Sequence, residues 1–289
     1  MTNIFVTGGN GQLAESIKDI ESNHSNLHFI YADIAQLDIA DFEAVKRFFN
    51  GQTIHYCINC AAYTAVDKAE SDQETAKKVN MLGAKNLAIA CAEKKATLIQ
   101  VSTDFVFNGE KSVAYTETDT TNPIGVYGAT KLEGELEVAK NLEQHFILRT
   151  SWLYSENANN FMKSMIKLSQ DRDVLNIVAD QIGTPTYATD LAETILKIIT
   201  TNNQEYGIYN YSNEGVASWY DFAKAIFEES NINIKVLPIK SEAYPTPAKR
   251  PHFSVLDKTK IKNNLQIEIP HWRESLKIAL FQIEEKKKT

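Results

Sequence analysis

The chain has 289 residues, of which 43% are hydrophobic and 23% charged, enough to build a substantial core. Its formal net charge of −7 argues against a nucleic-acid-binding protein, which needs a basic face. No apolar run approaches the ~20 residues that span a bilayer, and no secretory signal precedes the first strand. We therefore expect a cytoplasmic protein that binds neither nucleic acid nor membrane, with the basic run 286–288 as a solvated tail.

The three cysteines, Cys57, Cys60 and Cys91, are an odd number, which suits a reducing compartment. Cys57 and Cys60 have the spacing of a redox or zinc pair, but they lie in a strand-like run where residues three apart point to opposite faces. No second pair of cysteines or histidines completes a tetrahedral zinc site. We interpret all three as buried thiols and predict no bound metal.

The first strand and the loop after it have the pattern of a dinucleotide-binding turn. An apolar run at 3–7 is followed by Gly8, Gly11 and Ala14, and a helical stretch then extends to Ile20. Small residues let the backbone approach a diphosphate, which the free N–H groups of the helix N-terminus bind. An ordinary glycine-rich turn is the alternative, but the strand, the small residues and the helix together favour a dinucleotide.

The second predicted strand, at 27–31, ends close to Asp33, about 20 residues beyond the glycines. A carboxylate there binds the hydroxyl groups of the adenosine ribose and favours NAD, because it repels the 2′-phosphate of NADP. No arginine stands beside Asp33 to attract that phosphate. The alternative is that Asp33 caps a turn or a helix. Asp38 and Ile39 follow, before a helix predicted at 41–49.

The alternation of strand and helix continues through the next hundred residues. Strands are predicted at 53–60, 97–102 and 146–150, and a long helix at 72–94. Ala61 and Ala62 directly follow the first of these strands, where small residues let a cofactor cross the sheet edge. Thr103 and Asp104 follow the second, at the edge where open α/β sheets bind ligands.

A helix expected after Pro123 and Gly125 carries Tyr127 and Lys131, four residues apart. Residues with this spacing share a helix face, about 5–6 Å apart at Cβ. A cation so close favours the ionised phenol, so we expect the pKa of Tyr127 to fall from roughly 10 toward neutrality. Tyr127 is then a candidate general acid or base. A chance pairing of a half-buried tyrosine with a solvated lysine is the alternative.

Beyond residue 151 the pattern loosens. Helices are predicted at 160–170, 190–200, 219–229 and 272–285, and strands at 174–178 and 206–211. The whole pattern predicts a Rossmann-type doubly wound parallel sheet in an NAD(P)-binding domain at 1–151, to which 189–212 returns. Residues 152–188 and 213–289 are expected to form a smaller C-terminal α/β substrate-binding domain.

A proline-rich loop at 244–251 carries Lys249 and Arg250, which are the local candidates for binding a diphosphate. The alternative interpretation is that both are solvated charges on a rigid loop.

These motifs together resemble the extended short-chain dehydrogenase/reductase family, through the glycine motif at 7–11 and the pair Tyr127 and Lys131. Within it the chain is similar to the dTDP-4-dehydrorhamnose reductases. The matching stretches span nearly the whole chain and lie at 9–13, 59–70, 101–107, 127–135, 149–154, 180–186 and 244–251. The second and the last of them are specific to these reductases.

The resemblance implies that NADPH or NADH reduces the C4 ketone of a dTDP-linked 4-keto-6-deoxyhexose. Tyr127 would protonate the developing alkoxide, Lys131 would lower the tyrosine pKa and hold the nicotinamide ribose, and Thr103 would donate to the same oxygen. The implied cofactor contacts are Gly8, Gly11, Gln12, Leu13, Asp33, Asp38, Ile39, Ala61, Ala62, Tyr63, Tyr127 and Lys131. The implied substrate contacts are Thr64, Thr103, Asp104, Tyr127, Trp152, Lys249 and Arg250.

The chain departs from its apparent relatives at a few positions. Ala14 stands where many have glycine, and Cys60 and Phe105 replace the commoner alanine and tyrosine, but no proton-transfer group is lost. Some relatives dimerise through a magnesium ion held by an acid near the glycine loop. Ser16 takes that position here, so we predict no such metal site, although a homodimer stays open.

Three alternatives remain. A 4,6-dehydratase needs an Asp-Glu pair after the active-site threonine, and here Thr103 is followed by Asp104 and Phe105, which argues against it. A nucleotide-sugar epimerase keeps its cofactor bound, so cofactor content distinguishes it. A close relative serves as a regulatory, NADP-binding subunit of methionine adenosyltransferase, but the intact Thr103, Tyr127 and Lys131 favour an enzyme.

Overall fold

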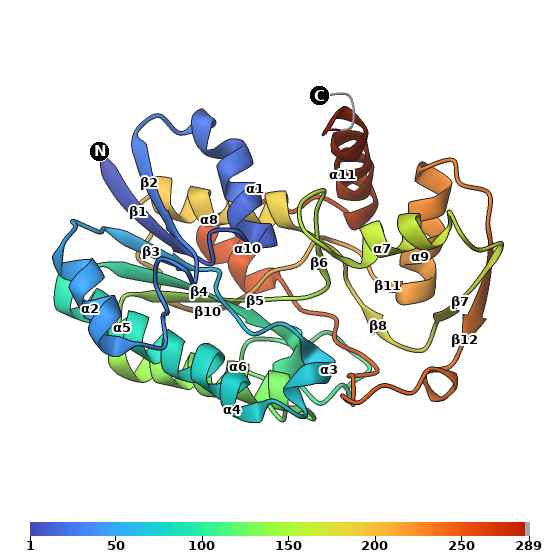
Figure 1. Ribbon diagram of the computed structural model, residues 1–289, viewed down its shortest axis with the longest axis horizontal. Coiled ribbons are helices and arrows are strands. Elements are labelled where there is room, and N and C mark those ends of the chain that lie inside the picture. The colour runs from blue at the N-terminus through green and yellow to red at the C-terminus, as the bar shows by residue number, and fades with distance from the viewer. Residues whose placement is uncertain (287–289) are drawn as a thin grey trace.

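The structure is a computed structural model that describes residues 1–286. Six parallel strands form the central sheet in the order β10-β5-β4-β3-β1-β2 (Figure 1). Their bounds are β1 (Thr2–Thr7), β2 (Leu27–Ala32), β3 (Tyr56–Asn59), β4 (Thr97–Thr103), β5 (His145–Thr150) and β10 (Gly207–Asn210). Thr7 pairs with Asn59, and Thr103 with Thr150, so the carboxyl ends of the strands meet at one edge. The predicted doubly wound parallel sheet is confirmed.

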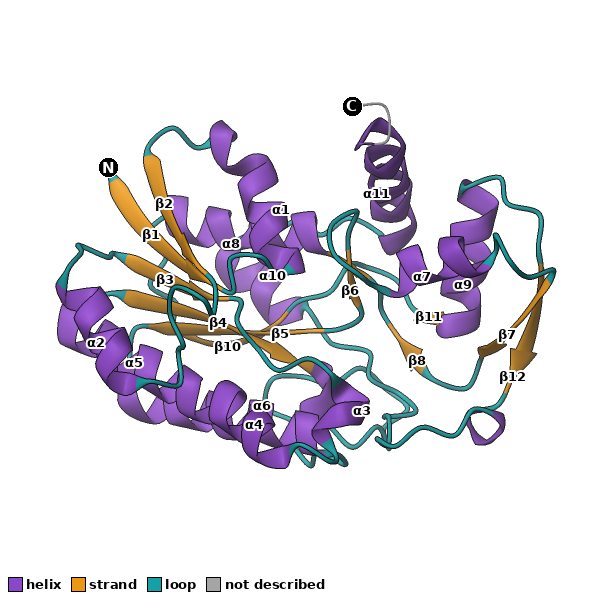
Figure 2. Cartoon of the chain, in the orientation of Figure 1, coloured by secondary structure: helices purple, strands orange, loops and turns teal. Residues whose placement is uncertain are grey.

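Helices cover both faces of this sheet (Figure 2). One face carries α1 (Gln12–Ile20), α8 (Ala188–Thr200) and α10 (Thr259–Leu265). The other face carries α2 (Phe42–Asn50), α5 (Ala84–Lys94) and α6 (Val126–Asn141). Because both faces are buried, the inner strands read as unbroken apolar runs such as Ile4, Phe5 and Val6, each fully buried.

Helix α10 lies in the range that we assigned to the substrate-binding domain, but it packs on the sheet. Its Ile261 and Leu265 belong to the same core as α1 and α8. The range of α10 was expected in the smaller domain, and a helix this short shows no recognisable apolar period that would indicate which core it joins. Strand β10 pairs with β5 and forms the edge of the sheet on that side.

The remaining elements build a smaller lobe with its own core around Tyr154, Phe222 and Trp272 (Figure 1). They are β6 (Leu153–Tyr154), α7 (Phe161–Leu168), β7 (Val174–Val178), β8 (Ile182–Gly183), β9 (Thr186–Tyr187), β11 (Ala217–Ser218), α9 (Trp219–Glu229), β12 (Lys235–Ile239), η4 (Ser241–Ala243) and α11 (Trp272–Lys286). Strands β7 and β12 pair in parallel at the far end of this lobe. Sequence analysis predicted β7 but missed β12, which contains Pro238.

The helix predicted at 72–94 is divided into three parts. It consists of α4 (Gln73–Lys77), the π-helical turn η2 (Lys78–Gly83) and α5. Single π-helical turns recur at functional sites, because they redirect side chains without ending the helix. Short turns elsewhere are η1 (Glu21–Asn23), α3 (Val66–Ala69) and η3 (Asp104–Val106).

Cys57 and Cys91 are buried free thiols, as expected, whereas Cys60 is only partly buried. Of the predicted lysine tail, Lys286 pairs with Asp19 at 3.0 Å, and Lys287 and Lys288 lie outside the described residues. Within residues 1–286, no helix has the length and apolar character needed to cross a membrane.

Candidate active site

The loop between β1 and α1 is shaped for close approach by a ligand. Gly8 has a φ of +63°, and a Cβ atom there would lie 2.8 Å from the backbone nitrogen of Ala61. The Gly11 N–H donates to the Gly8 carbonyl at 2.8 Å, which closes the turn. Helix α1 then begins at Gln12 without a side-chain cap, so its N-terminus is open to an anion. The geometry fits the diphosphate of a dinucleotide.

Two acids predicted as cofactor contacts, Asp33 and Asp38, already have protein partners. Asp33 accepts a 2.6 Å hydrogen bond from the side chain of Asn10, within the glycine loop. Asp38 accepts from the backbone N–H of Ala40 at 2.9 Å. Asp33 therefore lies beside the glycine loop, and its contact with the adenosine ribose stays a prediction.

Asn80, on the π-helical turn, fixes the loop that carries Tyr63. Its side chain accepts from the Tyr63 N–H at 2.8 Å and donates to the Tyr63 carbonyl at 3.2 Å. The same amide nitrogen donates to the Thr130 hydroxyl on α6 at 3.1 Å. Asn80 therefore ties the predicted cofactor loop to the helix of Tyr127. Sequence analysis missed it, because a polar residue in a long helix carries no signal of such a contact.

Thr103, Tyr127 and Lys131 meet at the carboxyl end of β4. Thr103 ends this strand, and its hydroxyl donates to the Asp104 carboxylate at 3.0 Å and lies close enough to the Tyr127 phenol to affect its pKa. Phe105 packs edge-on against the phenol ring, with the ring centroids 5.8 Å apart. The Lys131 ammonium donates to the Val101 carbonyl at 2.6 Å.

The pKa of Tyr127 moves in the direction opposite to the prediction. Burial raises it to about 12, and the nearby Thr103 hydroxyl lowers it by less. Burial also lowers the pKa of Lys131 to about 8, although nearby Glu135 opposes that change. The predicted fall toward neutrality is wrong here, because Lys131 is directed at the Val101 carbonyl and burial dominates. A phenol with a raised pKa keeps its proton at neutral pH, as a proton donor must.

A buried ion pair lies one helical turn beyond Lys131. Glu135 and Arg149 are 2% and 3% exposed, and their charged atoms are 2.7 Å apart. Ser102 also donates to the Glu135 carboxylate at 2.5 Å. Arg149 thereby neutralises an acid that would otherwise compete for Lys131. Sequence analysis missed this pair, although an arginine inside an apolar strand is itself a sign of a buried partner.

Glu70 caps the helix that carries Tyr127. The N-cap residue of α6, Gly125, offers no side chain, and the Glu70 carboxylate accepts from the Val126 N–H at 2.9 Å instead. A Cβ atom at Gly125 would lie 2.9 Å from the same carboxylate oxygen, so glycine makes room for it. This contact joins residues 56 positions apart and has no local signal.

Asp104 is the most deeply buried of the predicted substrate contacts, at 2% exposure. Burial raises its pKa to about 6, while Ser254 and Thr103 lower it. Its Oδ2 atom has no hydrogen bond of normal geometry within the described residues, although Ser254 lies close enough to affect the pKa. Thr64, another predicted contact, is exposed.

The two charges of the proline-rich loop have different environments. Arg250 forms an ion pair with Asp67 of α3 at 2.8 Å and also donates to the Ala248 carbonyl. The hydrogen bond from Arg250 holds the pKa of Asp67 below its ordinary value. Lys249 is exposed. Arg250 is therefore not a solvated charge, whereas Lys249 is exposed, and the diphosphate role of both stays a prediction.

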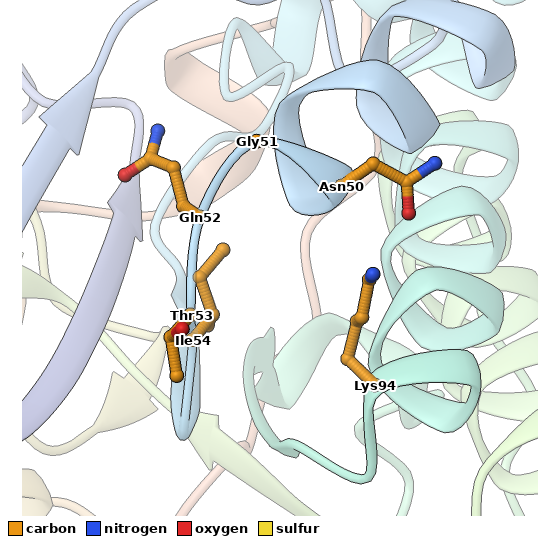
Figure 3. Close-up of a pocket in the computed structure, with 6 residues that line it drawn as sticks. All are labelled: Asn50, Gly51, Gln52, Thr53, Ile54 and Lys94. Carbon is orange, nitrogen blue, oxygen red and sulfur yellow. The ribbon is translucent and has the colours of Figure 1, made fainter.

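A cavity of about 370 Å³ lies away from all of these groups. It is lined by Asn50, Gly51, Gln52, Thr53, Ile54 and Lys94 (Figure 3). Ile54 precedes β3 and Lys94 ends α5, so the cavity opens at the amino ends of the strands. None of the predicted site residues contributes to it. We therefore place the candidate active site at the opposite, carboxyl edge.

Known proteins are similar to this chain over nearly its whole length. The family model of the RmlD substrate binding domain matches residues 1–284. The chain is 40% identical to the dTDP-4-dehydrorhamnose reductase of Aggregatibacter actinomycetemcomitans over 288 residues, which cover 96% of this chain and 98% of that one.

Two solved structures extend the similarity to three dimensions. The dTDP-4-dehydrorhamnose reductase of Clostridium acetobutylicum has a TM-score of 0.95 and 42% identity, covering 98% of this chain and 100% of the other. That of Bacillus anthracis, in complex with NADP, has a TM-score of 0.93 and 38% identity, covering 98% and 99%. The chain belongs to the RmlD substrate binding domain family, as its sequence motifs predicted.

Proposed function

We propose that this protein reduces the C4 ketone of dTDP-4-dehydrorhamnose (dTDP-4-dehydro-6-deoxy-L-mannose) to the alcohol of dTDP-L-rhamnose, with NADPH or NADH as reductant. The observation that carries the proposal is the proximity of Thr103 and Tyr127 at the carboxyl end of β4, on the same sheet edge as the glycine loop. The names of the relatives that match nearly the full chain supply the substrate.

The glycine loop and its neighbours would hold the cofactor. Gly8 and Gly11 leave the space that a diphosphate needs, and the uncapped start of α1 supplies N–H groups. Asp33 would contact the adenosine ribose, and Lys131 the nicotinamide ribose. The bound cofactor supplies a hydride. The relative from Bacillus anthracis binds NADP, which supports NADPH although Asp33 leans toward NADH.

Tyr127 would deliver the proton that completes the reduction. Its raised pKa keeps the phenol protonated at neutral pH, so a proton is available when negative charge develops on the ketone oxygen. The Thr103 hydroxyl would donate a second hydrogen bond to that oxygen. Two donors aimed at one developing alkoxide lower its free energy more than that of the neutral ketone, which is how such sites accelerate reactions.

The substrate would lie between this pair and the smaller lobe. Asp104, whose Oδ2 has no hydrogen bond of normal geometry within residues 1–286, would accept from a sugar hydroxyl. Thr64 and Trp152 would line the sugar, and Lys249 and Arg250 would lie near the diphosphate. Lys249 is exposed and would be free to face the diphosphate. Arg250 is paired with Asp67, so the Asp67 carboxylate would offset part of its attraction for the diphosphate. We also retain a cytoplasmic location and a homodimer as predictions.

The test follows oxidation of NADPH and of NADH separately, with dTDP-4-dehydrorhamnose as the substrate. We expect turnover with at least one cofactor and dTDP-L-rhamnose as the product. Folded protein that binds cofactor but shows no turnover with either would point to a regulatory role instead. Purification with tightly bound NAD and interconversion of two sugars would point to an epimerase.

A further inference from the structure

Two tryptophans stack face to face in the smaller lobe, close to the end of β5. The ring centroids of Trp152 and Trp219 are 3.6 Å apart and the ring planes differ by 8°. Trp219 is held in turn, because its indole N–H donates to Gln181 at 3.2 Å and Phe161 packs against its ring at 4.6 Å. Gln181 also donates to Ser241 at 3.0 Å, which anchors the arrangement to the loop after β12.

Trp152 is forced into its position by several contacts. Its φ is +47°, a strained conformation that is rare for a bulky residue. The Thr186 N–H donates to the Trp152 carbonyl at 3.2 Å, which holds the strained backbone. A Cβ atom on Gly183 would lie 2.7 Å from the indole, so the indole lies against Gly183 as well as Trp219.

Trp152 follows the strand that pairs with the strand of Thr103, where the reacting carbon would lie. Thr150, the last residue of β5, pairs with Thr103, and Trp152 follows two residues later at the same edge of the sheet. A ketone carbon in contact with Thr103 would therefore lie at the sheet edge from which Trp152 continues into the smaller lobe. In a 6-deoxyhexose the apolar group closest to C4 is the C6 methyl, which is attached to the neighbouring ring carbon.

We propose that Trp219 is a specificity-determining residue that positions the Trp152 indole as a rigid apolar wall against the C6 methyl of the sugar. The inference rests on the proposed function, because it assumes a 6-deoxyhexose at Thr103. A 6-hydroxyl group would meet the same wall without a hydrogen-bond partner. The stack thus selects deoxy sugars, and Trp219 acts through Trp152 without touching the substrate.

The stack itself can be detected without activity. The chain has 3 tryptophans, and two parallel indoles in van der Waals contact couple electronically, giving a pair of circular-dichroism bands of opposite sign. We expect Trp219→Phe to remove this signal. Trp272→Phe is the matched control, because Trp272 packs edge-on against Phe222 and stacks on no other tryptophan among the described residues. A signal that survives Trp219→Phe would overturn the arrangement.

The selectivity is measured as the ratio of dissociation constants for dTDP-L-mannose and dTDP-L-rhamnose. A hydrophobic site rejects one added polar group or carbon by about tenfold to a hundredfold, so we expect a wild-type ratio of at least about tenfold. Trp219→Ala should reduce the ratio to within about threefold, with the affinity for dTDP unchanged. Gly183→Ala should also reduce this ratio to within about threefold, because the added methyl group would displace the Trp152 indole.

Retained selectivity in both Trp219→Ala and Gly183→Ala would refute the inference. If Trp219→Ala does not fold, the selectivity of Gly183→Ala decides the question. Failure of the proposed function looks different, because the wild-type protein would then neither bind dTDP-L-rhamnose nor reduce its ketone precursor. Normal wild-type turnover with unchanged selectivity in the variants overturns only the role of Trp219.

Discussion

Replacing Glu70 with alanine tests whether a contact distant in sequence positions Tyr127. The substitution removes both the acceptor for the Val126 N–H and a negative charge at the start of α6. Losing a cap costs about 0.5–2 kcal/mol, and losing the charge about 0.3–1 kcal/mol. Because Tyr127 directly follows Val126, we also expect kcat to fall by roughly tenfold, as small displacements of a reacting group do.

The assay compares the urea unfolding free energies and kcat of three variants. We expect Glu70→Ala to lose about 1–2 kcal/mol, and Glu70→Gln, which keeps an acceptor, only about 0.5 kcal/mol. Glu133→Ala is the control on the same helix, because it removes only an exposed ion pair with Lys77, worth about 0–1 kcal/mol. A Glu70→Ala protein as stable and as active as Glu133→Ala would refute the reasoning.

Three further predictions follow from burial and close contacts. The pKa of Asp104 in the folded protein is about 6, above its ordinary 3.8, so folding favours the protonated carboxyl. The free energy of unfolding of the wild type should therefore fall by ~3 kcal/mol as pH rises from about 4 to 6. Urea unfolding of Asp104→Asn should not show this fall. Asp67→Ala removes the ion pair with Arg250, so it should release the loop 244–251 and speed its cleavage by trypsin. An unchanged cleavage rate would contradict the idea that this ion pair holds the loop. Gly128→Ala should cost about 1–3 kcal/mol in urea unfolding, because its Cβ would lie 2.1 Å from a backbone oxygen, while Gly51→Ala, with contacts of 3.7 Å, should cost far less.

The sheet and the cofactor loop could be predicted because their signals are local. Gly8 and Gly11 follow a buried strand directly, and Thr103 stands at the end of another, so chain order alone places them at one edge. The spacing of Tyr127 and Lys131 likewise reports a shared helix face. Each of these inferences depends only on residues within one element or at its end.

The contacts that sequence analysis missed or misjudged depend on packing between distant segments. Glu70 contacts the start of α6, 56 positions further along the chain. The contacts of Asn80 arise from a π-helical turn, which the hydrophobic periodicity of the sequence does not indicate. The direction of the Tyr127 pKa was wrong, because spacing placed Lys131 near the phenol but could not give its burial or its bond to a strand carbonyl. Stacking of Trp219 on Trp152 joins residues of separate elements and was equally invisible.

The central claim is that Tyr127 protonates a sugar ketone at the end of β4. Its most direct test compares wild-type protein with Tyr127→Phe in NADPH oxidation by dTDP-4-dehydrorhamnose, alongside the dissociation constant of NADPH. We predict that kcat/KM falls by at least about 100-fold while NADPH affinity stays within about twofold, because only the proton donor is lost. Unchanged turnover in Tyr127→Phe would contradict the account.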